Sequence, residues 1–229
     1  MGIFAREPEY DRSRILDAAA RARAAKRYRK AVALYRRVLA VEPRNVELHA
    51  RLAPLLAVTG NAFDAWESFR YCAEAALAEK RVEQAAAIYR EAARCLPREL
   101  AAWLGYAAAE RRRGKEREAL TALLEARRHF RGRRIRPQRI ALLRQALEID
   151  PSSVAVALDL ARQLARSDQQ SEAQLVLERI VQQAVGSDLR RVRGAQWRLA
   201  PTLSNTWRWL RPGAGSARPA AARSRRMHA

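Results

Sequence analysis

Apolar residues recur at helical spacing in one phrase that the chain repeats. The phrase occurs three times, each copy 54 residues after the last, as ALYRRVLAVEPRN at 33–45, AIYREAARCLPRE at 87–99 and ALLRQALEIDPSS at 141–153. Around the first copy Ala31, Tyr35 and Val38 lie at spacings of four and three, on one helical stripe. Pro43 follows five residues later and ends the helix, because proline lacks an N–H and restricts its predecessor. Each phrase therefore predicts a helix with its own stop signal.

The segments that follow each phrase also match one another. Aligned apolar residues each precede an alanine, in the pairs Leu52–Ala53, Tyr106–Ala107 and Leu160–Ala161. We expect a helix over 46–59, kinked at Pro54, and further helices over 62–78 and 116–130. Boundary signals accompany them: Asn45 and either Ser152 or Ser153 as N-caps, and Gly60 and Gly114 as left-handed helix ends.

The composition favours the same class of fold. Hydrophobic residues make up 49% of the 229 residues, with Ala and Leu dominant and Val, Ile and Thr sparse. This balance favours helices over strands. We predict an all-α protein.

The pattern resembles the tetratricopeptide repeat, whose 34 residues place small and large residues at fixed positions in two helices. Residues 12–45 supply Ile15, Ala19, Tyr28, Ala31, Tyr35, Val38 and Pro43; residues 66–99 supply Phe69, Ala73, Ala85, Tyr89, Ala92 and Pro97; residues 100–133 supply Trp103, Leu104, Ala107, Gly114, Ala119, Leu123 and Ala126. The resemblance covers about residues 12–185. It implies an α-solenoid of stacked antiparallel helix pairs, in which small residues let neighbouring helices approach closely.

The spacing of 54 residues departs from the family period of 34 and indicates a super-period of three helices. We therefore expect the superhelical regularity to fail near residues 80 and 132. The domain plan is an N-terminal extension (1–11), repeats (12–130), an Arg-rich loop (131–136), repeats (137–185), capping helices (186–211) and a disordered basic tail (212–229).

The capping segment is rich in large apolar residues, which we expect to cover the last repeat. They are Leu189, Val192, Trp197, Leu199, Leu203, Trp207, Trp209 and Leu210. A terminal cap is needed because the final helix pair would otherwise leave an apolar face in water. The alternative is a membrane-surface segment with interleaved Trp and Arg.

The formal net charge is +21, and arginine supplies most of it. Such a balance favours anionic partners, although solvated helix surface accounts for part of it. Cys72 and Cys95 are too few for a disulfide framework, and neither a leader segment nor a long apolar stretch is evident. We therefore expect a cytoplasmic location, and the Arg and Ala enrichment suggests a bacterial source.

No arrangement of residues predicts catalysis. His49, His129 and His228 are scattered, without Cys, Asp or Glu at metal-ligand spacing on a shared helical face. Glu110 and Glu116 flank a basic turn, and we expect both to be solvated. The prediction is a protein that is not an enzyme and has no metal, cofactor or small-molecule substrate.

The resemblance implies a groove lined by first helices, with an apolar floor and a basic wall. Carried onto this chain, its partner-binding positions are Leu16, Arg23, Leu104, Arg111, Arg112, Leu158, Arg162 and Arg166. They suit an acidic or amphipathic segment of a partner protein. Leu16 and Ala20 stand where chaperone-binding members have Lys and Asn, so binding of chaperone tails is disfavoured.

A second basic feature is the segment RRHFRGRRIRPQR at 127–139, which has no acidic residue. Its candidate anion-binding residues are Arg127, Arg128, Arg131, Arg133, Arg134 and Arg136. His129 and Phe130 interrupt the arginines, and a nucleic-acid binder would use them for stacking. The alternatives are that Phe130 is the last core residue of its helix and that the segment is a solvated linker. The two functional hypotheses are thus a non-catalytic protein-binding adaptor and a nucleic-acid or ribonucleoprotein binder. Attachment to a membrane surface ranks below both.

Overall fold

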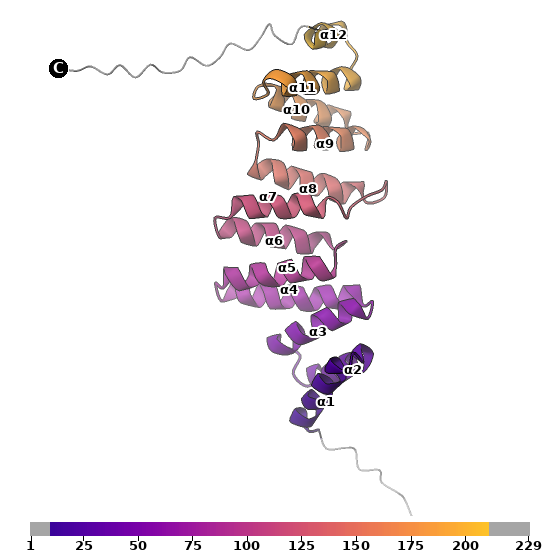
Figure 1. Ribbon diagram of the computed structural model, residues 1–229, viewed down its shortest axis with the longest axis vertical. Coiled ribbons are helices and arrows are strands. Elements are labelled where there is room, and N and C mark those ends of the chain that lie inside the picture. Colours follow the sequence, from indigo (N-terminus) through magenta and orange to yellow (C-terminus); the bar gives the residue numbers. More distant parts are fainter. Residues whose placement is uncertain (1–9, 211–229) are drawn as a thin grey trace, which may run out of the picture. The chain divides into compact units, whose positions relative to one another are not determined.

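The computed structural model describes residues 10–210, and within them every regular element is a helix (Figure 1). The all-α prediction is confirmed. Residues 1–9 and 211–229 lie outside the described range, so nearly all of the predicted N-terminal extension and the whole predicted disordered tail fall outside it.

The chain divides into two compact units, residues 1–138 and residues 139–229. The helices of the first unit are α1 (Arg12–Ala24), α2 (Tyr28–Leu39), α3 (Val46–Val58), α4 (Ala62–Ala78), α5 (Val82–Cys95), α6 (Leu100–Arg112) and α7 (Glu116–Ala126). Helix α8 (Arg136–Ile149) spans the division, and the second unit continues with α9 (Val154–Ala165), α10 (Gln170–Val181), α11 (Gly186–Leu199) and α12 (Leu203–Leu210).

Helices α1 to α7 each pack on the next helix in the first unit, and α9 to α12 do so in the second, so each unit contains a stretch of α-solenoid. Helix α3 also contacts α5, and α9 contacts α11, each pair skipping one helix. The predicted solenoid architecture is confirmed.

Small residues occupy the contacts between helices, as the repeat pattern requires. Ala19, Ala53 and Ala119 are each 0% exposed, so a larger side chain has no room at these positions. Tyr35 and Trp103 are buried beside such positions, at 1% and 4% exposure. Alternating small and large side chains in this way lets the helices interlock.

Most of the predicted boundary signals are present. Asn45 is the N-cap of α3, and its side chain accepts a hydrogen bond of 3.1 Å from the backbone N–H of Leu48. Gly60 and Gly114 have φ of +86° and +74°, in the left-handed region that glycine adopts without strain. Ser153 is the N-cap of α9, although its side chain makes no capping hydrogen bond.

The predicted helix 116–130 is too long, because α7 ends at Ala126. Residues 127–129 form a turn that starts with a hydrogen bond from the Arg128 N–H to the Glu125 carbonyl at 2.9 Å. Phe130 is 3% exposed and returns to the core from this turn. The apolar pattern in the sequence thus continues beyond the end of α7, because its last residue, Phe130, is buried although it lies in a loop.

The expectation that Glu110 is solvated is also wrong. Glu110 is 4% exposed and pairs with Arg113, whose Nη1 lies 3.0 Å from Glu110 Oε2. Arg113 Nη2 also lies 2.8 Å from Glu83 Oε1 on α5. A buried carboxylate is tolerated here because a guanidinium both neutralises and hydrogen-bonds it.

The capping segment covers its neighbours only in part. Leu189 and Val192 of α11 are buried, at 5% and 0% exposure. By contrast Leu203, Trp207 and Leu210 of α12 are 92%, 58% and 62% exposed, so these three side chains do not lie against the last repeat as expected. The cause is the orientation of α12, which turns its polar side toward α11.

Candidate partner-binding surfaces

The predicted groove residues of the first unit lie on the exposed sides of α1 and α6. Leu16 and Leu104 are half-buried, whereas Arg23, Arg111 and Arg112 are exposed. The spacing of seven between Leu16 and Arg23, and between Leu104 and Arg111, places each pair on one helix face. Each helix therefore presents a leucine with arginine two turns later.

The two helices that carry these faces have different neighbours in the stack. Helix α1 packs on α2, and α6 packs on α5 and α7. The remaining predicted residues, Leu158, Arg162 and Arg166, belong to α9 in the second unit, where Leu158 is half-buried and both arginines are exposed. The same chemistry thus recurs on three separate helices.

A buried polar network holds α8 on α9 beneath the α9 face. Arg139 Nη2 lies 3.0 Å from Asp159 Oδ2, and Gln163 Nε2 donates to Asp159 Oδ1 at 3.2 Å. Asp159 is 7% exposed, so its charge depends on these partners. The network links α8 to α9 next to the half-buried Leu158.

An open hollow of 560 Å³ lies at the helix ends of the first unit, and the sequence did not predict it. Its lining is mostly small or apolar and comes from the end of α3, the start of α4, the α5–α6 connection and the turn after α7: Ala57, Ala62, Cys95, Leu96, Pro97, Arg98, Glu99 and His129. These residues are far apart in the sequence, and only the stacking of the helices brings them together. The hollow has room for an apolar side chain of a partner, with one charge of each sign at its rim.

The wall of this hollow is fixed by Trp103. Its ring stacks on that of His129 with a centroid separation of 5.7 Å and an interplanar angle of 20°. Its indole N–H donates to the Pro97 carbonyl at 3.1 Å. Burial raises the pKa of the Cys95 thiol, which keeps it in the neutral, weakly nucleophilic form. Trp103 thus supports two residues of the lining, Pro97 and His129.

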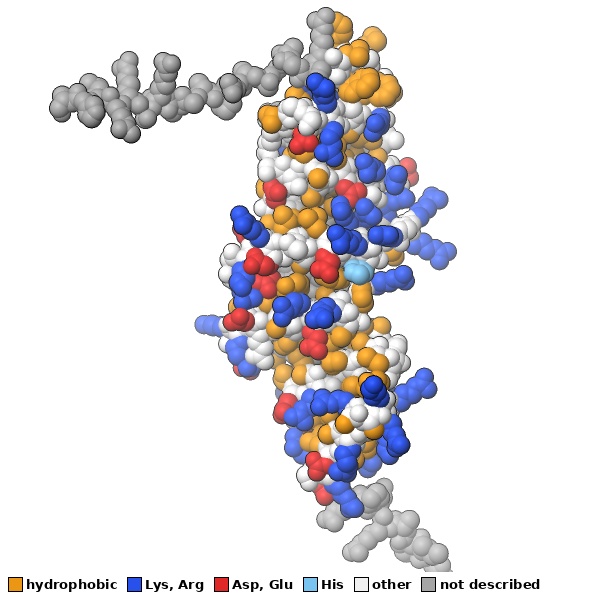
Figure 2. Space-filling view, viewed as in Figure 1, with side chains coloured by type: hydrophobic (Ala, Val, Ile, Leu, Met, Phe, Trp, Pro, Cys, Tyr) orange, Lys and Arg blue, Asp and Glu red, His pale blue; other side chains and the backbone are white. Residues whose placement is uncertain are grey.

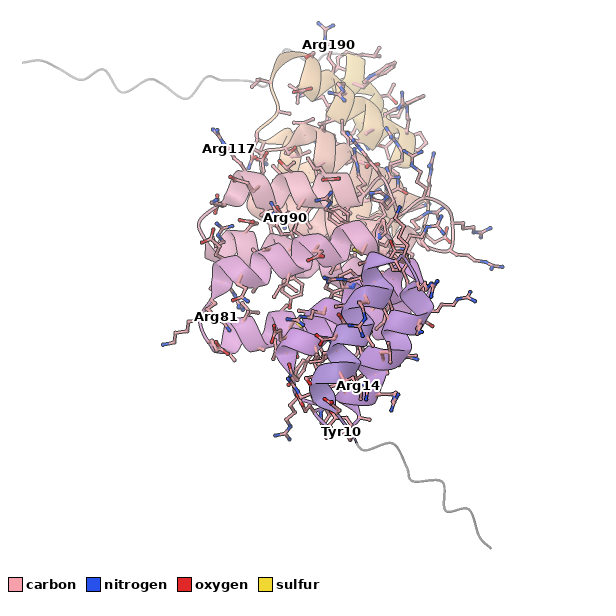
Figure 3. The ribbon with its side chains drawn as sticks, turned by 60° about the horizontal axis from the view of Figure 1, so that its bottom comes forward. Tyr10, Arg14, Arg81, Arg90, Arg117 and Arg190 are labelled. Atoms are coloured by element: carbon pink, nitrogen blue, oxygen red, sulfur yellow. The ribbon has the colours of Figure 1, made fainter. Side chains whose placement is uncertain are left out.

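A second hollow, of 740 Å³, lies beside the turns that precede α5 and α7. Its charged lining combines four cations with one carboxylate: Lys80, Arg81, Arg113, Lys115 and Glu83. Figure 3 shows Arg81 and Arg117 of the first unit projecting outward from the protein. The first unit thus offers cationic side chains at several places on its surface.

The arginine segment forms the connection between α7 and α8. Arg128, Arg131, Arg133 and Arg134 are exposed, whereas Arg127 and Arg136 are half-buried. Figure 2 shows basic side chains projecting where this connection runs. Phe130 is buried at 3% exposure and so is not available for stacking on a base.

Two features are absent from the part of the chain that the structure describes. Among the described residues no group of three or more His, Cys, Asp or Glu side chains could hold a metal ion. No helix in residues 10–210 combines the length and the apolar character needed to cross a membrane.

Comparison with known proteins identifies the repeat. Residues 140–196 match the tetratricopeptide repeat family, so this stretch of the chain carries the repeat. No protein with a curated description matches the chain.

Similar solved structures include a thermophilic tetratricopeptide-repeat protein from Thermus thermophilus, at 21% identity over 81% of this chain and 98% of that one, with a TM-score of 0.27. PilW, described as a widely conserved type IV pilus biogenesis factor, is 15% identical over 88% of this chain and 93% of its own, with a TM-score of 0.30. YrrB, described as having an unusual peptide-binding site, is 11% identical over 86% and 90%, with a TM-score of 0.28.

Proposed function

We propose that this chain, which carries tetratricopeptide repeats, is a non-catalytic scaffold that binds an acidic or amphipathic segment of a partner protein. The observation that carries the proposal is the exposed face of α6. Half-buried Leu104 lies on it two turns before exposed Arg111 and Arg112. Ala101 and Ala108, both exposed, complete a shallow apolar strip.

A partner segment with apolar residues three or four apart and carboxylates at one end fits this face. Its apolar side chains would cover Leu104 and the alanines, and its carboxylates would meet the two arginines. The hollow beside Trp103 adjoins the first residues of α6 through Arg98 and Glu99, and offers a place for one larger apolar side chain. Leu16 with Arg23, and Leu158 with Arg162 and Arg166, provide the same chemistry on α1 and α9.

The test is binding of the full chain to an array of amphipathic peptides, each synthesised with Asp and Glu and again with Asn and Gln. We expect the acidic peptides to bind at least about tenfold more tightly, a difference of about 1.4 kcal/mol. The Arg111→Glu/Arg112→Glu variant should lose this preference.

The matched control is Arg29→Glu/Arg37→Glu, which makes the same charge change at two exposed arginines on α2 in the same unit. This control should bind as the wild type does. If both variants lost the preference for acidic peptides equally, peptide binding would depend on the net charge of the protein alone. That result would contradict a binding site on α6. If the acidic and the amide peptides bound equally well to the wild type, the proposed binding of acidic segments to this face of α6 would be wrong.

The exposed arginines between α7 and α8 favour a second candidate, binding of nucleic acid. Phosphate contacts release counterions, so the affinity for duplex DNA should fall with salt at a log–log slope of about −0.9 per neutralised phosphate. Replacing Arg131, Arg133 and Arg134 by Gln should make the slope shallower by up to about 2.7, three times that value. A slope unchanged by these substitutions would reject the segment as a nucleic-acid site.

A further inference from the structure

Helix α12 is attached to α11 through polar side chains. The Asn205 side-chain amide donates to the Ala200 carbonyl at 2.9 Å, and Trp197 Nε1 donates to Thr206 Oγ1 at 3.1 Å. Asn205 and Thr206 are both half-buried. The polar side of this short helix therefore faces the protein.

The opposite side of α12 is apolar and faces outward. Leu203, Trp207 and Leu210 follow one another at spacings of four and three, which places them on one helix face. They are 92%, 58% and 62% exposed. Figure 2 shows the resulting group of hydrophobic side chains over α12, at the top of the view.

Three contacts fix this orientation. The rings of Trp197 and Trp209 stack with a centroid separation of 5.4 Å and an interplanar angle of 15°. Arg193 Nη1 donates to the Arg208 carbonyl at 3.1 Å, near the end of α12. A Cβ at Gly194 would lie 3.3 Å from Trp209 Nε1, so glycine permits the close approach of the indole. Turning α12 to bury its apolar side would break these contacts.

The part of the sequence that carries the apolar face is strongly basic. Residues 186–229 contain ten arginines and one acidic residue, Asp188. Arg190, Arg198 and Arg208 are exposed on α11 and α12, and five of the ten arginines follow α12 in residues 211–229. An apolar helix face in a segment with this excess of positive charge favours a binding partner that is both apolar and anionic.

We propose that α12 docks on the surface of an anionic lipid bilayer. Leu203, Trp207 and Leu210 enter the boundary between headgroups and acyl chains, where Trp is favoured, while the arginines contact the anionic headgroups. The helix lies in the interface and does not cross the bilayer.

A second copy of the chain is a poorer occupant of this face. A helix of eight residues is about 12 Å long, far too short to supply the ~800 Å² per partner of a standard protein interface. Two copies meeting here would also bring their arginines together. A bilayer needs no complementary shape, and its charge is opposite.

The experiment is sedimentation of the full chain with vesicles of phosphatidylcholine alone and of phosphatidylcholine mixed with phosphatidylglycerol. We expect binding to the anionic vesicles and at least about tenfold weaker binding to the neutral ones. Leu203→Ser/Trp207→Ala/Leu210→Ser should weaken binding to the anionic vesicles by at least about tenfold.

The matched control is Val41→Ser/Phe63→Ala/Leu175→Ser, which alters three exposed apolar residues on other parts of the surface, with exposures of 59%, 76% and 61%. It should bind as the wild type does. Circular dichroism of each variant checks that the helices are retained.

Three outcomes would overturn the proposal. They are no binding to anionic vesicles, equal weakening by the control, and binding that depends on anionic lipid but is unchanged by the α12 substitutions. Concentration-dependent self-association that the α12 variant abolishes would assign the face to a second copy instead. None of these results bears on peptide binding at α6, so this inference stands or falls separately from the proposed function.

Discussion

Gly105 lies where α6 passes the ring of Tyr89 on α5. A Cβ built there would be 2.6 Å from Tyr89 Cε1 and 2.7 Å from Cδ1, well inside normal contact. Alanine is otherwise the better helix former by roughly 1 kcal/mol, so Gly105→Ala would stabilise an open site. Here we expect it to lower the free energy of unfolding by about 1–3 kcal/mol, because the Tyr89 ring must shift.

Urea unfolding of a double-mutant cycle checks this expectation. In a Tyr89→Ala background the obstructing ring is absent, and Gly105→Ala should be neutral or stabilising there. The same loss in both backgrounds would show that the ring is not the cause.

Trp103 joins the α5–α6 connection to the turn after α7. It is 4% exposed, donates to the Pro97 carbonyl and stacks on His129. Trp103→Ala should therefore lower the free energy of unfolding by about 3–5 kcal/mol in a urea titration. Trp103→Phe keeps an aromatic ring but loses the N–H donor, and should cost clearly less. Equal costs would contradict a contribution from packing of the ring.

Single residues were predictable where their local chemistry has one outcome. The residues next to them were enough to predict Asn45 as a helix cap and Gly60 and Gly114 as residues with a left-handed backbone conformation. The same turn is made by residues that no rule singles out, since Lys26, Lys80 and Asp168 have φ of +57°, +58° and +60°. The burial of Glu110 could not be predicted from the sequence either. The only local signal was Arg113 three residues later, whereas Glu83, the second partner of Arg113, comes from another helix.

At the scale of elements, Glu42 links the start of α1 to the start of α3. Its carboxylate accepts from Arg12 Nε at 2.5 Å and from the Asn45 side chain at 2.7 Å, while Asn45 caps α3. These hydrogen bonds, the one from Arg12 first, lower the Glu42 pKa below its ordinary value of 4.5. A lowered pKa in the folded state means that the contribution is present above pH 4.5 and is lost as the pH falls through the folded value.

The Glu42→Gln variant should therefore be less stable than the wild type at neutral pH, and the difference should shrink as the solution is acidified below the ordinary glutamate pKa. Urea midpoints measured across this pH range check the prediction. Glu91→Gln, at an exposed carboxylate on α5, is the control and should leave the pH dependence unchanged. A difference that grows on acidification would contradict the assignment.

The helices themselves were largely predictable, and their roles in the stack were not. The repeated phrase equates α2, α5 and α8, yet α5 contacts α3 across one helix, as α11 contacts α9. The helices pack in pairs, but the phrase recurs every third helix. Successive copies of the phrase therefore fall alternately on the second and on the first helix of a pair. For α12 the large apolar residues predicted a cover for the last repeat, but their presence does not state which side of the helix faces the protein. Asn205, Thr206 and Trp209 made the contact instead.

Across the whole molecule, the principal helix contacts within each unit join neighbours or next neighbours in the sequence. Such local packing explains why repeat spacing predicted the architecture, since no long-range pairing had to be inferred. The surface hollow beside Trp103 was not predictable for the opposite reason. Its lining comes from the ends of helices that meet only after the stack has formed.

The net charge of +21 leads to a prediction about the molecule as a whole. Between residues 10 and 210, ion pairs such as Arg144–Glu172, with side-chain exposures of 45% and 38%, lie at the surface, so each contributes little and is itself screened by salt. Repulsion among the excess arginines is spread over the surface and opposes folding. Raising NaCl from about 0.01 to 1 M shortens the Debye length from about 30 to 3 Å and should weaken this repulsion.

We therefore expect the thermal midpoint of the full chain to rise with NaCl, by about 2–4 °C for each kcal/mol of repulsion removed. The Arg131→Gln/Arg133→Gln/Arg134→Gln variant lowers the net charge by three at exposed positions and should start from a higher midpoint at low salt and rise less. A midpoint that falls with salt would mean that favourable ion pairs outweigh the excess charge. In that case the ion pairs of the arginines would stabilise the fold, and the arginines would not form an excess of unneutralised charge for binding an anionic partner.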